Sequence, residues 1–111
     1  MKIIRYCFAL DLINDQKLID EYKNYHNKVW PEIVESIKSS GIESMEIYNI
    51  SNRLFMIIEA SENFSLKSKK QADKKNLIVQ KWEKLMWSYQ KALPMAKNEE
   101  KWIQMSSIFK L

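Results

Sequence analysis

The first segment of the chain alternates between apolar and polar positions. From Ile3 to Leu12 the even-numbered residues are apolar or aromatic, whereas the odd-numbered ones include Arg5 and Asp11. Such alternation is typical of a strand that turns one face to the core. We therefore predict a half-buried strand whose inner face carries Ile4, Tyr6, Phe8, Leu10 and Leu12.

Two helices separated by a proline are predicted next. Asn14 or Asp15 can cap the first helix. The residues of its inner face recur at helical spacing and comprise Leu18, Ile19, Tyr22, His26 and Val29. Pro31 disfavours a helical backbone at Trp30 and suits the first turn of a second helix, which we expect to end at Gly41, the only glycine.

A hairpin follows the second helix. Residues 42–50 and 53–60 are strand-like, and Ser51 and Asn52 can turn the chain between them. The run Leu-Phe-Met-Ile-Ile at 54–58 is apolar on both faces. A run of this kind is typical of a central strand, so we place it inside the sheet.

The C-terminal part begins with a lysine-rich stretch and ends in an apolar tail. Residues 67–75 hold five of the eighteen basic residues, and we interpret them as the solvated face of a helix. A longer amphipathic helix is predicted up to Pro94, with Leu77, Val79, Trp82, Leu85, Met86, Tyr89 and Leu93 on its apolar stripe. A last strand of unspecified register is expected between Trp102 and Leu111.

This order of elements predicts an α+β fold, a ferredoxin-like split βαβ domain in which helices cover one face of an antiparallel sheet. The length of 111 residues and the 46% hydrophobic content suit a single domain over residues 1–111. Because Ile57 and its neighbours leave apolar groups on the other face, we expect a homodimer formed by sheet packing.

Composition excludes several classes of function. With one cysteine, Cys7, and one histidine, the chain has no ligand set for zinc, so we expect no metal ion as cofactor. The net charge of +4 is concentrated in a stretch without interleaved aromatic residues, which argues against nucleic acid. The apolar start is broken by Arg5 and ended by Asp11, so we expect neither a signal peptide nor a membrane span, and a cytoplasmic location.

The stretch from Tyr22 to Glu35 holds the candidate chemistry. Tyr22 and His26 are four residues apart and share a helix face, and Trp30 lies at the helix break. A hydroxyl, an imidazole and an indole together can form a small pocket for a polar ligand. The alternative is a partly buried histidine that only satisfies a hydrogen bond.

The same residues carry a resemblance to a known family. They are HNKVWPE at 26–32 with Tyr22 before it, Gly41 ahead of a strand with Ile47 and Tyr48, and Trp82 followed by Met86 and Pro94. Over nearly its whole length the chain resembles the L-rhamnose mutarotases. The resemblance implies a small cytoplasmic dimer that interconverts the α and β anomers of a 6-deoxy-L-hexose without metal or nucleotide. It makes His26 the proton donor, with Tyr22 and Trp82 in contact with the sugar, although a tryptophan at helical spacing also suits a core.

Two positions depart from that family. The rhamnose enzymes have tyrosine where this chain has Met45, and a second tryptophan where it has Glu83. Met45 removes a hydroxyl and Glu83 adds an acceptor, so the pocket should bind a different set of sugar hydroxyls, and L-fucose is a close second substrate to L-rhamnose. A second proton-transfer group is also needed, and Tyr22, Glu83 or water can serve.

Two other functions share this architecture. Small dimeric ferredoxin-like monooxygenases, some of them haem-degrading, also use histidine, asparagine and tryptophan. A ferredoxin-like module that binds RNA or a protein partner is the non-catalytic alternative. The chain lacks the glycine- and aromatic-rich strand motif of an RNA-recognition domain, which favours a sheet packed against protein.

Overall fold

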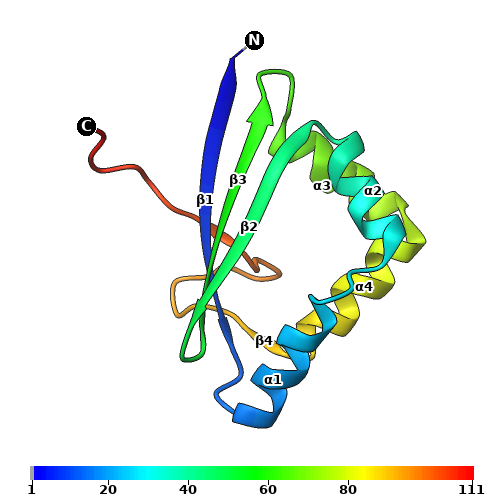
Figure 1. Cartoon of the computed structure of the whole chain (residues 1–111), viewed down its shortest axis with the longest axis vertical. Coiled ribbons are helices and arrows are strands. Elements are labelled where there is room, and N and C mark those ends of the chain that lie inside the picture. Colours follow the sequence, from blue (N-terminus) through cyan, green and yellow to red (C-terminus); the bar gives the residue numbers. More distant parts are fainter. Residues whose placement is uncertain (1) are drawn as a thin grey trace.

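Four helices lie on one face of an antiparallel sheet in the computed structural model, which describes residues 2–111 (Figure 1). The elements in chain order are β1 (Ile3–Leu12), α1 (Gln16–Tyr25), α2 (Pro31–Ser39), β2 (Ile42–Ile50), β3 (Arg53–Ser61), α3 (Leu66–Lys75), α4 (Leu77–Trp87), β4 (Gln90–Lys91) and β5 (Ile103–Gln104). The strand order is β2-β3-β1-β4, and β5 also pairs with β1. The predicted α+β, ferredoxin-like class is confirmed.

Strand β3 lies between β1 and β2, as its apolar run predicted. It pairs with both neighbours along almost its whole length, for example Ile58 with Tyr6 on one side and with Met45 on the other. The turn after β2 is tight, since Ser51 has a φ of 52°. The predicted strand over 3–12 and the predicted hairpin are therefore confirmed.

Local signals set the starts of the first two helices. The Asp15 carboxylate accepts a hydrogen bond of 3.1 Å from the backbone N–H of Leu18, which caps α1. Pro31 opens α2, where a missing N–H costs nothing. Gly41 follows the end of α2 with a φ of 102°, in the left-handed region that a glycine tolerates.

Helix α1 is shorter than its periodicity suggested. It ends at Tyr25, His26 is its C-terminal cap, and Val29 lies beyond it. Trp30 is extended, with φ −54° and ψ 133°, because the following proline disfavours the helical backbone there. The prediction that Val29 belongs to the helix was wrong, although Val29 still packs against the core.

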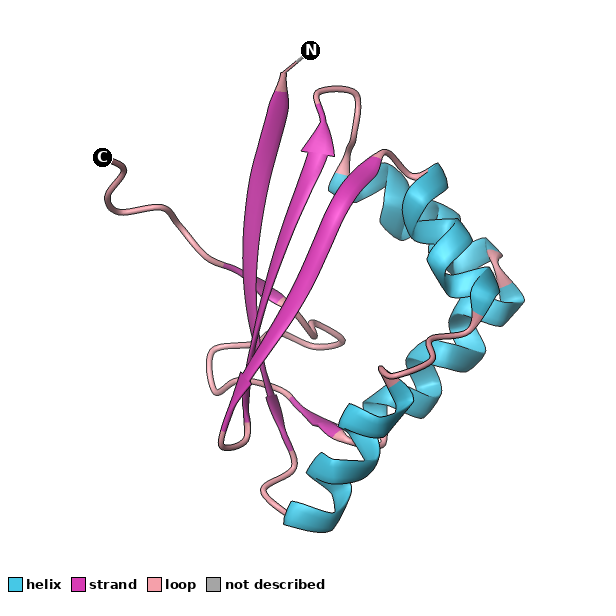
Figure 2. Cartoon of the chain, viewed as in Figure 1, coloured by secondary structure: helices cyan, strands magenta, loops and turns pink. Residues whose placement is uncertain are grey.

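Helix α4 is also shorter than predicted. It ends at Trp87, whereas the pattern continued to Leu93. Beyond it the chain leaves the helix and continues into a short strand (Figure 2). This strand is β4, in which Gln90 pairs with Leu12 of β1. Tyr89 and Leu93 are buried even so. Burial against the sheet produces the same apolar pattern as a continued helix, so the pattern predicted a C-terminal end of α4 that is too late.

Most of the segment predicted as the last strand, residues 102–111, does not form a strand. Ile103 and Gln104 pair with Ala9 and Phe8 of β1, and the backbone N–H of Met105 donates to the carbonyl of Cys7 at 2.7 Å. The tail beyond them leaves the sheet, as Figure 1 shows, and the side chain of Ile108 is 96% exposed. Apolar residues form a strand only where another strand lies beside them in space, so the composition of this tail alone did not make a strand.

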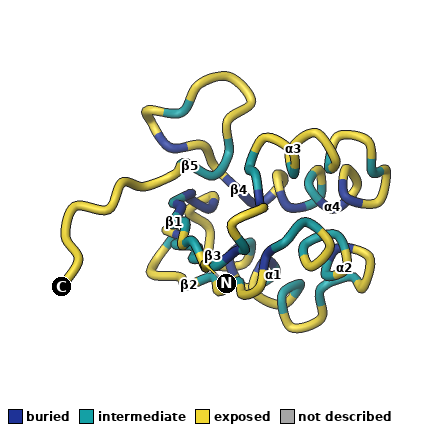
Figure 3. Tube along the Cα trace, turned by 90° about the horizontal axis from the view of Figure 1, so that it is seen from above, coloured by how far each residue is buried: buried dark blue, intermediate teal, exposed yellow. Residues whose placement is uncertain are grey.

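The core lies between the sheet and the helices, where Figure 3 shows the buried positions. The largest fully buried side chains are Leu10, Leu12 and Leu54, all on the strands of the sheet. By contrast, α3 buries none of its residues, as expected of the lysine-rich stretch. Among residues 2–111, no helix is long and apolar enough to cross a membrane.

Truncation of a sheet residue should show how much stability this core provides. We expect Leu54→Ala, at a position only 2% exposed, to lower the free energy of unfolding by about 2–5 kcal/mol, because it leaves a cavity. Leu77→Ala is the matched control, since Leu77 is 79% exposed, and should change it by less than about 0.5 kcal/mol. Urea denaturation at one protein concentration measures both, and equal effects would contradict this account of the core.

Candidate functional site

The candidate site begins where α1 ends. In a continuous helix the carbonyl of Tyr22 would accept from the backbone N–H four residues later. At this terminus the backbone N–H of His26 donates instead to the carbonyl of Lys23, at 3.0 Å. The Tyr22 carbonyl is thereby free for another donor, as carbonyls at helix C-termini commonly are.

The imidazole of His26 uses that free carbonyl. Its Nδ1 lies 2.8 Å from the Tyr22 carbonyl oxygen. Because a carbonyl only accepts, Nδ1 carries a proton. In the neutral ring Nε2 then holds the lone pair, and in the charged ring Nε2 carries the second proton. The backbone thus assigns all proton exchange at His26 to Nε2.

Tyr22 lies beneath this histidine and is almost completely buried. Its ring centroid is 4.5 Å from that of His26, and its side chain is 3% exposed. The side-chain amide of Gln90 donates a hydrogen bond of 3.1 Å to the Tyr22 hydroxyl. Burial raises the pKa of the Tyr22 hydroxyl, and the bond from Gln90 opposes that rise. Tyr22 therefore keeps its proton at neutral pH and is a poor base.

Trp82 of α4 closes another side of the site with its rings nearly edge-on to three neighbours. The ring centroids of Trp30, His26 and Tyr25 lie 5.0, 5.9 and 6.3 Å from it. Edge-to-face contacts of this kind stabilise a fixed ring orientation. Trp82 is buried, so it belongs to the core and to the wall of the site together.

These side chains surround a cavity of about 260 Å³ between the sheet and the helices. Of the residues singled out in the sequence, Tyr22, His26, Met45, Trp82 and Glu83 line it, whereas Trp30 packs against Trp82 and does not line the cavity. They come from α1 and its cap, from β2 and from α4. The structure therefore brings together residues that are up to 61 positions apart in the chain, from Tyr22 to Glu83.

Sequence reasoning missed several polar residues of the same cavity. Lys69, Asp73, Gln90 and Lys101 also line it. Nζ of Lys69 lies 2.9 and 3.0 Å from the two carboxylate oxygens of Asp73. A signal for this pair existed, since Asp73 is the one acidic residue in the lysine-rich stretch and lies four positions after Lys69. Gln90 and Lys101 had no such signal.

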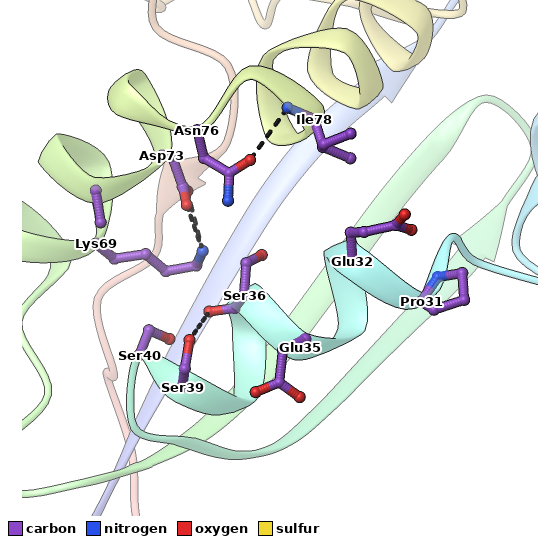
Figure 4. Close-up of a pocket in the computed structure, with 11 residues that line it drawn as sticks. Pro31, Glu32, Glu35, Ser36, Ser39, Ser40, Lys69, Asp73, Asn76 and Ile78 are labelled. Carbon is purple, nitrogen blue, oxygen red and sulfur yellow. Dashed lines mark hydrogen bonds and ion pairs between the residues drawn. The ribbon is translucent and has the colours of Figure 1, made fainter.

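A second, larger hollow of about 720 Å³ lies between α2 and the α3–α4 segment (Figure 4). Its polar lining includes Glu32, Glu35 and three serines of α2 and its C-terminal cap. Ser36, Lys69 and Asp73 border both this groove and the cavity. The groove is lined by none of the residues singled out in the sequence, so we place the candidate chemistry in the cavity.

The side chains that could ligate a metal ion lie apart from one another. Within residues 2–111, no group of three or more histidine, cysteine, aspartate or glutamate side chains is placed to hold such an ion. Cys7 is a free thiol on β1, half-buried. The polar side chains that line the cavity are acid–base and hydrogen-bonding groups.

Comparison with known proteins assigns the chain to a family. A family model described as L-rhamnose mutarotase matches residues 5–111. The chain belongs to this family. The mutarotase is thus an isomerase that interconverts the anomers of a sugar, and the resemblance noted in its sequence is confirmed.

Individual relatives cover most of the mutarotase. An L-fucose mutarotase of Xanthomonas campestris pv. campestris is 39% identical over 113 residues, which span 100% of the chain and 90% of the relative. An L-rhamnose mutarotase of Shouchella clausii is 32% identical and spans 73% of the chain and 71% of the relative.

Solved structures show the same architecture. The crystal structure of an L-rhamnose mutarotase from Formosa agariphila matches with a TM-score of 0.72 and 25% identity, over 97% of this mutarotase and 98% of that chain. A tetracenomycin F2 cyclase from Streptomyces glaucescens matches with a TM-score of 0.61 at 11% identity. At that identity the second likeness concerns the fold alone.

Proposed function

We propose that this mutarotase interconverts the α and β anomers of a 6-deoxy-L-hexose in the cavity, with His26 as its catalytic residue. The hydrogen bond from His26 Nδ1 to the Tyr22 carbonyl carries the proposal. It leaves Nε2 as the single exchangeable position, in a cavity whose other walls can hold a sugar. Histidine is the side chain most often used for proton transfer near neutral pH.

The cavity suits a small neutral ligand. Its volume of about 260 Å³ lies just below the roughly 300–1,000 Å³ typical of sites for drug-sized molecules. The charges of Lys69 and Lys101 are balanced by those of Asp73 and Glu83. Trp82 and the methionine side chains offer apolar surface for the C–H face and the methyl group of a 6-deoxy sugar.

Anomer exchange requires two proton transfers. The charged His26 donates its Nε2 proton to the ring oxygen as the bond from that oxygen to C1 breaks, and the anomeric hydroxyl loses its proton to a base. The open-chain aldehyde turns about its C1–C2 bond, and the ring closes on the other face of the carbonyl with both protons returned. Tyr22 keeps its proton, so we assign the base to the carboxylate of Glu83 or Asp73, directly or through water.

The sugar we favour is L-fucose, with L-rhamnose as the second candidate. The sequence placed L-rhamnose first. The relative that is 39% identical is an L-fucose mutarotase, whereas the L-rhamnose mutarotase of Shouchella clausii is 32% identical. Met45 and Glu83, the two positions that depart from the rhamnose enzymes, both line the cavity.

We also place the protein in the cytoplasm. The free thiol of Cys7 suits this reducing compartment.

We also propose that the mutarotase acts as a homodimer packed through the outer face of its sheet. Strand alternation puts Cys7, Phe55 and Ile57 on the face away from the helices. Ion pairs flank this apolar centre at 2.9 Å, between Arg5 and Glu59, and at 2.7 Å, between Arg53 and Asp11. An apolar centre inside a charged rim is the usual composition of a protein interface.

Substitutions of His26 and Tyr22 should separate proton transfer from binding. We expect His26→Ala to slow exchange by about 10²- to 10⁴-fold, because acid–base assistance is lost. Tyr22→Phe, which keeps the ring, should raise the half-saturating sugar concentration more than it lowers the maximal rate. NMR exchange spectroscopy between the anomeric protons measures both above the background in water.

The control for these variants is Lys23→Ala, at an exposed position of the same helix. It should exchange both sugars at the wild-type rate, and circular dichroism should show that all three variants are folded. A folded His26→Ala variant with near-wild-type exchange would make the histidine structural and transfer the acid role to another group of the cavity.

The preference between the two sugars should depend on Met45 and Glu83, the two positions that differ from the rhamnose enzymes. We expect Met45→Tyr combined with Glu83→Trp to shift the ratio of exchange rates toward L-rhamnose by about tenfold or more, since a changed hydrogen bond to a buried hydroxyl contributes roughly 1–3 kcal/mol. The ratio for the two sugars, measured in one sample by NMR, is independent of enzyme concentration. An unchanged ratio would mean that neither residue contacts the sugar.

Dimerisation can be measured directly. We expect light scattering to give twice the mass of one 13.3 kDa chain, and Ile57→Lys to give a monomer, because a buried lysine on a sheet interface is costly. Gln71→Lys, on the exposed helix α3, is the matched control and should remain dimeric. A wild-type chain that is monomeric at micromolar concentration would refute this proposal.

A further inference from the structure

Gln90 is a buried polar residue in the wall of the cavity. Its side chain is 7% exposed, and it lines the cavity beside Tyr22, 68 positions away in the chain. Its backbone pairs with Leu12 of β1 in the short strand β4. This pairing fixes the position from which the side chain reaches Tyr22.

The bond between the two side chains has a direction. Nε2 of Gln90 donates to the Tyr22 hydroxyl oxygen at 3.1 Å, so that oxygen acts as an acceptor. A tyrosine hydroxyl can still donate its own proton. In the described part of the chain, no side chain or carbonyl accepts that proton, and Tyr22 lines the cavity. The proton is therefore available to a ligand.

We propose that Gln90 is a positioning residue that makes the Tyr22 hydroxyl a hydrogen-bond donor to a sugar oxygen in the cavity. This inference rests on the proposed function and adds a direction to the contact of Tyr22 with the sugar. If residue 90 offered a hydrogen-bond acceptor in place of the amide N–H, the Tyr22 hydroxyl would donate its proton to that residue and away from the cavity. The hydroxyl would then offer the sugar only a lone pair.

Two substitutions distinguish these states. Gln90→Met keeps the length of the side chain and removes the donor, so the Tyr22 hydroxyl can rotate freely. Gln90→Glu at pH 8 replaces the donor by a carboxylate, which only accepts. We expect the dissociation constant for L-fucose, measured by NMR titration, to rise about threefold for Gln90→Met and about tenfold for Gln90→Glu.

A change of pH adds a readout that a merely structural role would not produce. A buried carboxyl group has a raised pKa, so lowering the pH to 6 protonates part of the carboxylate introduced by Gln90→Glu. The protonated group can donate to Tyr22 again. The affinity of Gln90→Glu relative to wild type should then recover, whereas that of Gln90→Met should stay constant. Taking each ratio to wild type at the same pH removes the contribution of His26.

Repeating both substitutions with Tyr22→Phe closes the test. Without the hydroxyl, the two Gln90 variants should bind L-fucose as tightly as Tyr22→Phe alone. The inference would be overturned if the Gln90 substitutions weakened L-fucose binding by the same factor with and without the Tyr22 hydroxyl. Wild-type affinity in both single variants would overturn it as well. If Gln90→Glu does not fold, the Gln90→Met cycle decides. Wild-type protein that binds the sugar without speeding exchange would refute the proposed reaction alone, and one that binds neither L-fucose nor L-rhamnose would refute both.

Discussion

The end of helix α1 is the constraint on which the site depends. Pro31 keeps Trp30 extended, so no helix can run through this position, and α1 ends earlier, at Tyr25, with a tightened last turn. The N–H of His26 then bonds to Lys23, and the carbonyl of Tyr22 takes the imidazole instead. A helix that ran on through residue 30 would have used that carbonyl in its own ladder and left Nδ1 of His26 unassigned. The end of α1 at Tyr25 thus leaves Nε2 as the ring nitrogen of His26 that is not committed to the backbone.

The site is built on the core rather than added to its surface. Tyr22 and Trp82 belong to the main hydrophobic cluster, and both line the cavity. Their rings are held by neighbouring aromatic rings and, for Tyr22, by Gln90 from the short strand β4. Groups held in this way lose little freedom when a ligand binds, which lowers the entropic cost of binding. The same packing means that large changes at these positions act on stability and on the site together.

The charged side chains that line the cavity balance one another. A mutarotase must hold a neutral molecule with hydroxyls on several sides and release it unchanged in composition. Two positive and two negative side chains face the cavity, so its net charge is close to zero while donors and acceptors remain plentiful. Lys69 and Asp73 neutralise each other from adjacent turns of α3, on a helix that is otherwise solvated. The helix that buries none of its residues therefore still contributes to the site.

Alternation, periodicity and punctuation in the sequence by themselves determined β1, the hairpin, the start of α2 and the ferredoxin-like order, because these signals act over a few neighbouring residues. The spacing of Tyr22 and His26 likewise pointed to one helix face, and the cluster around them to the family. Only the tertiary structure decided where α4 ends, which part of the C-terminal tail pairs, and that Gln90 meets Tyr22. Buried loops and buried helices carry the same apolar pattern, and a strand needs a partner that lies far away in the chain. Contacts across 68 positions leave no local trace, so the direction of the Tyr22 hydroxyl bond could come only from the folded chain.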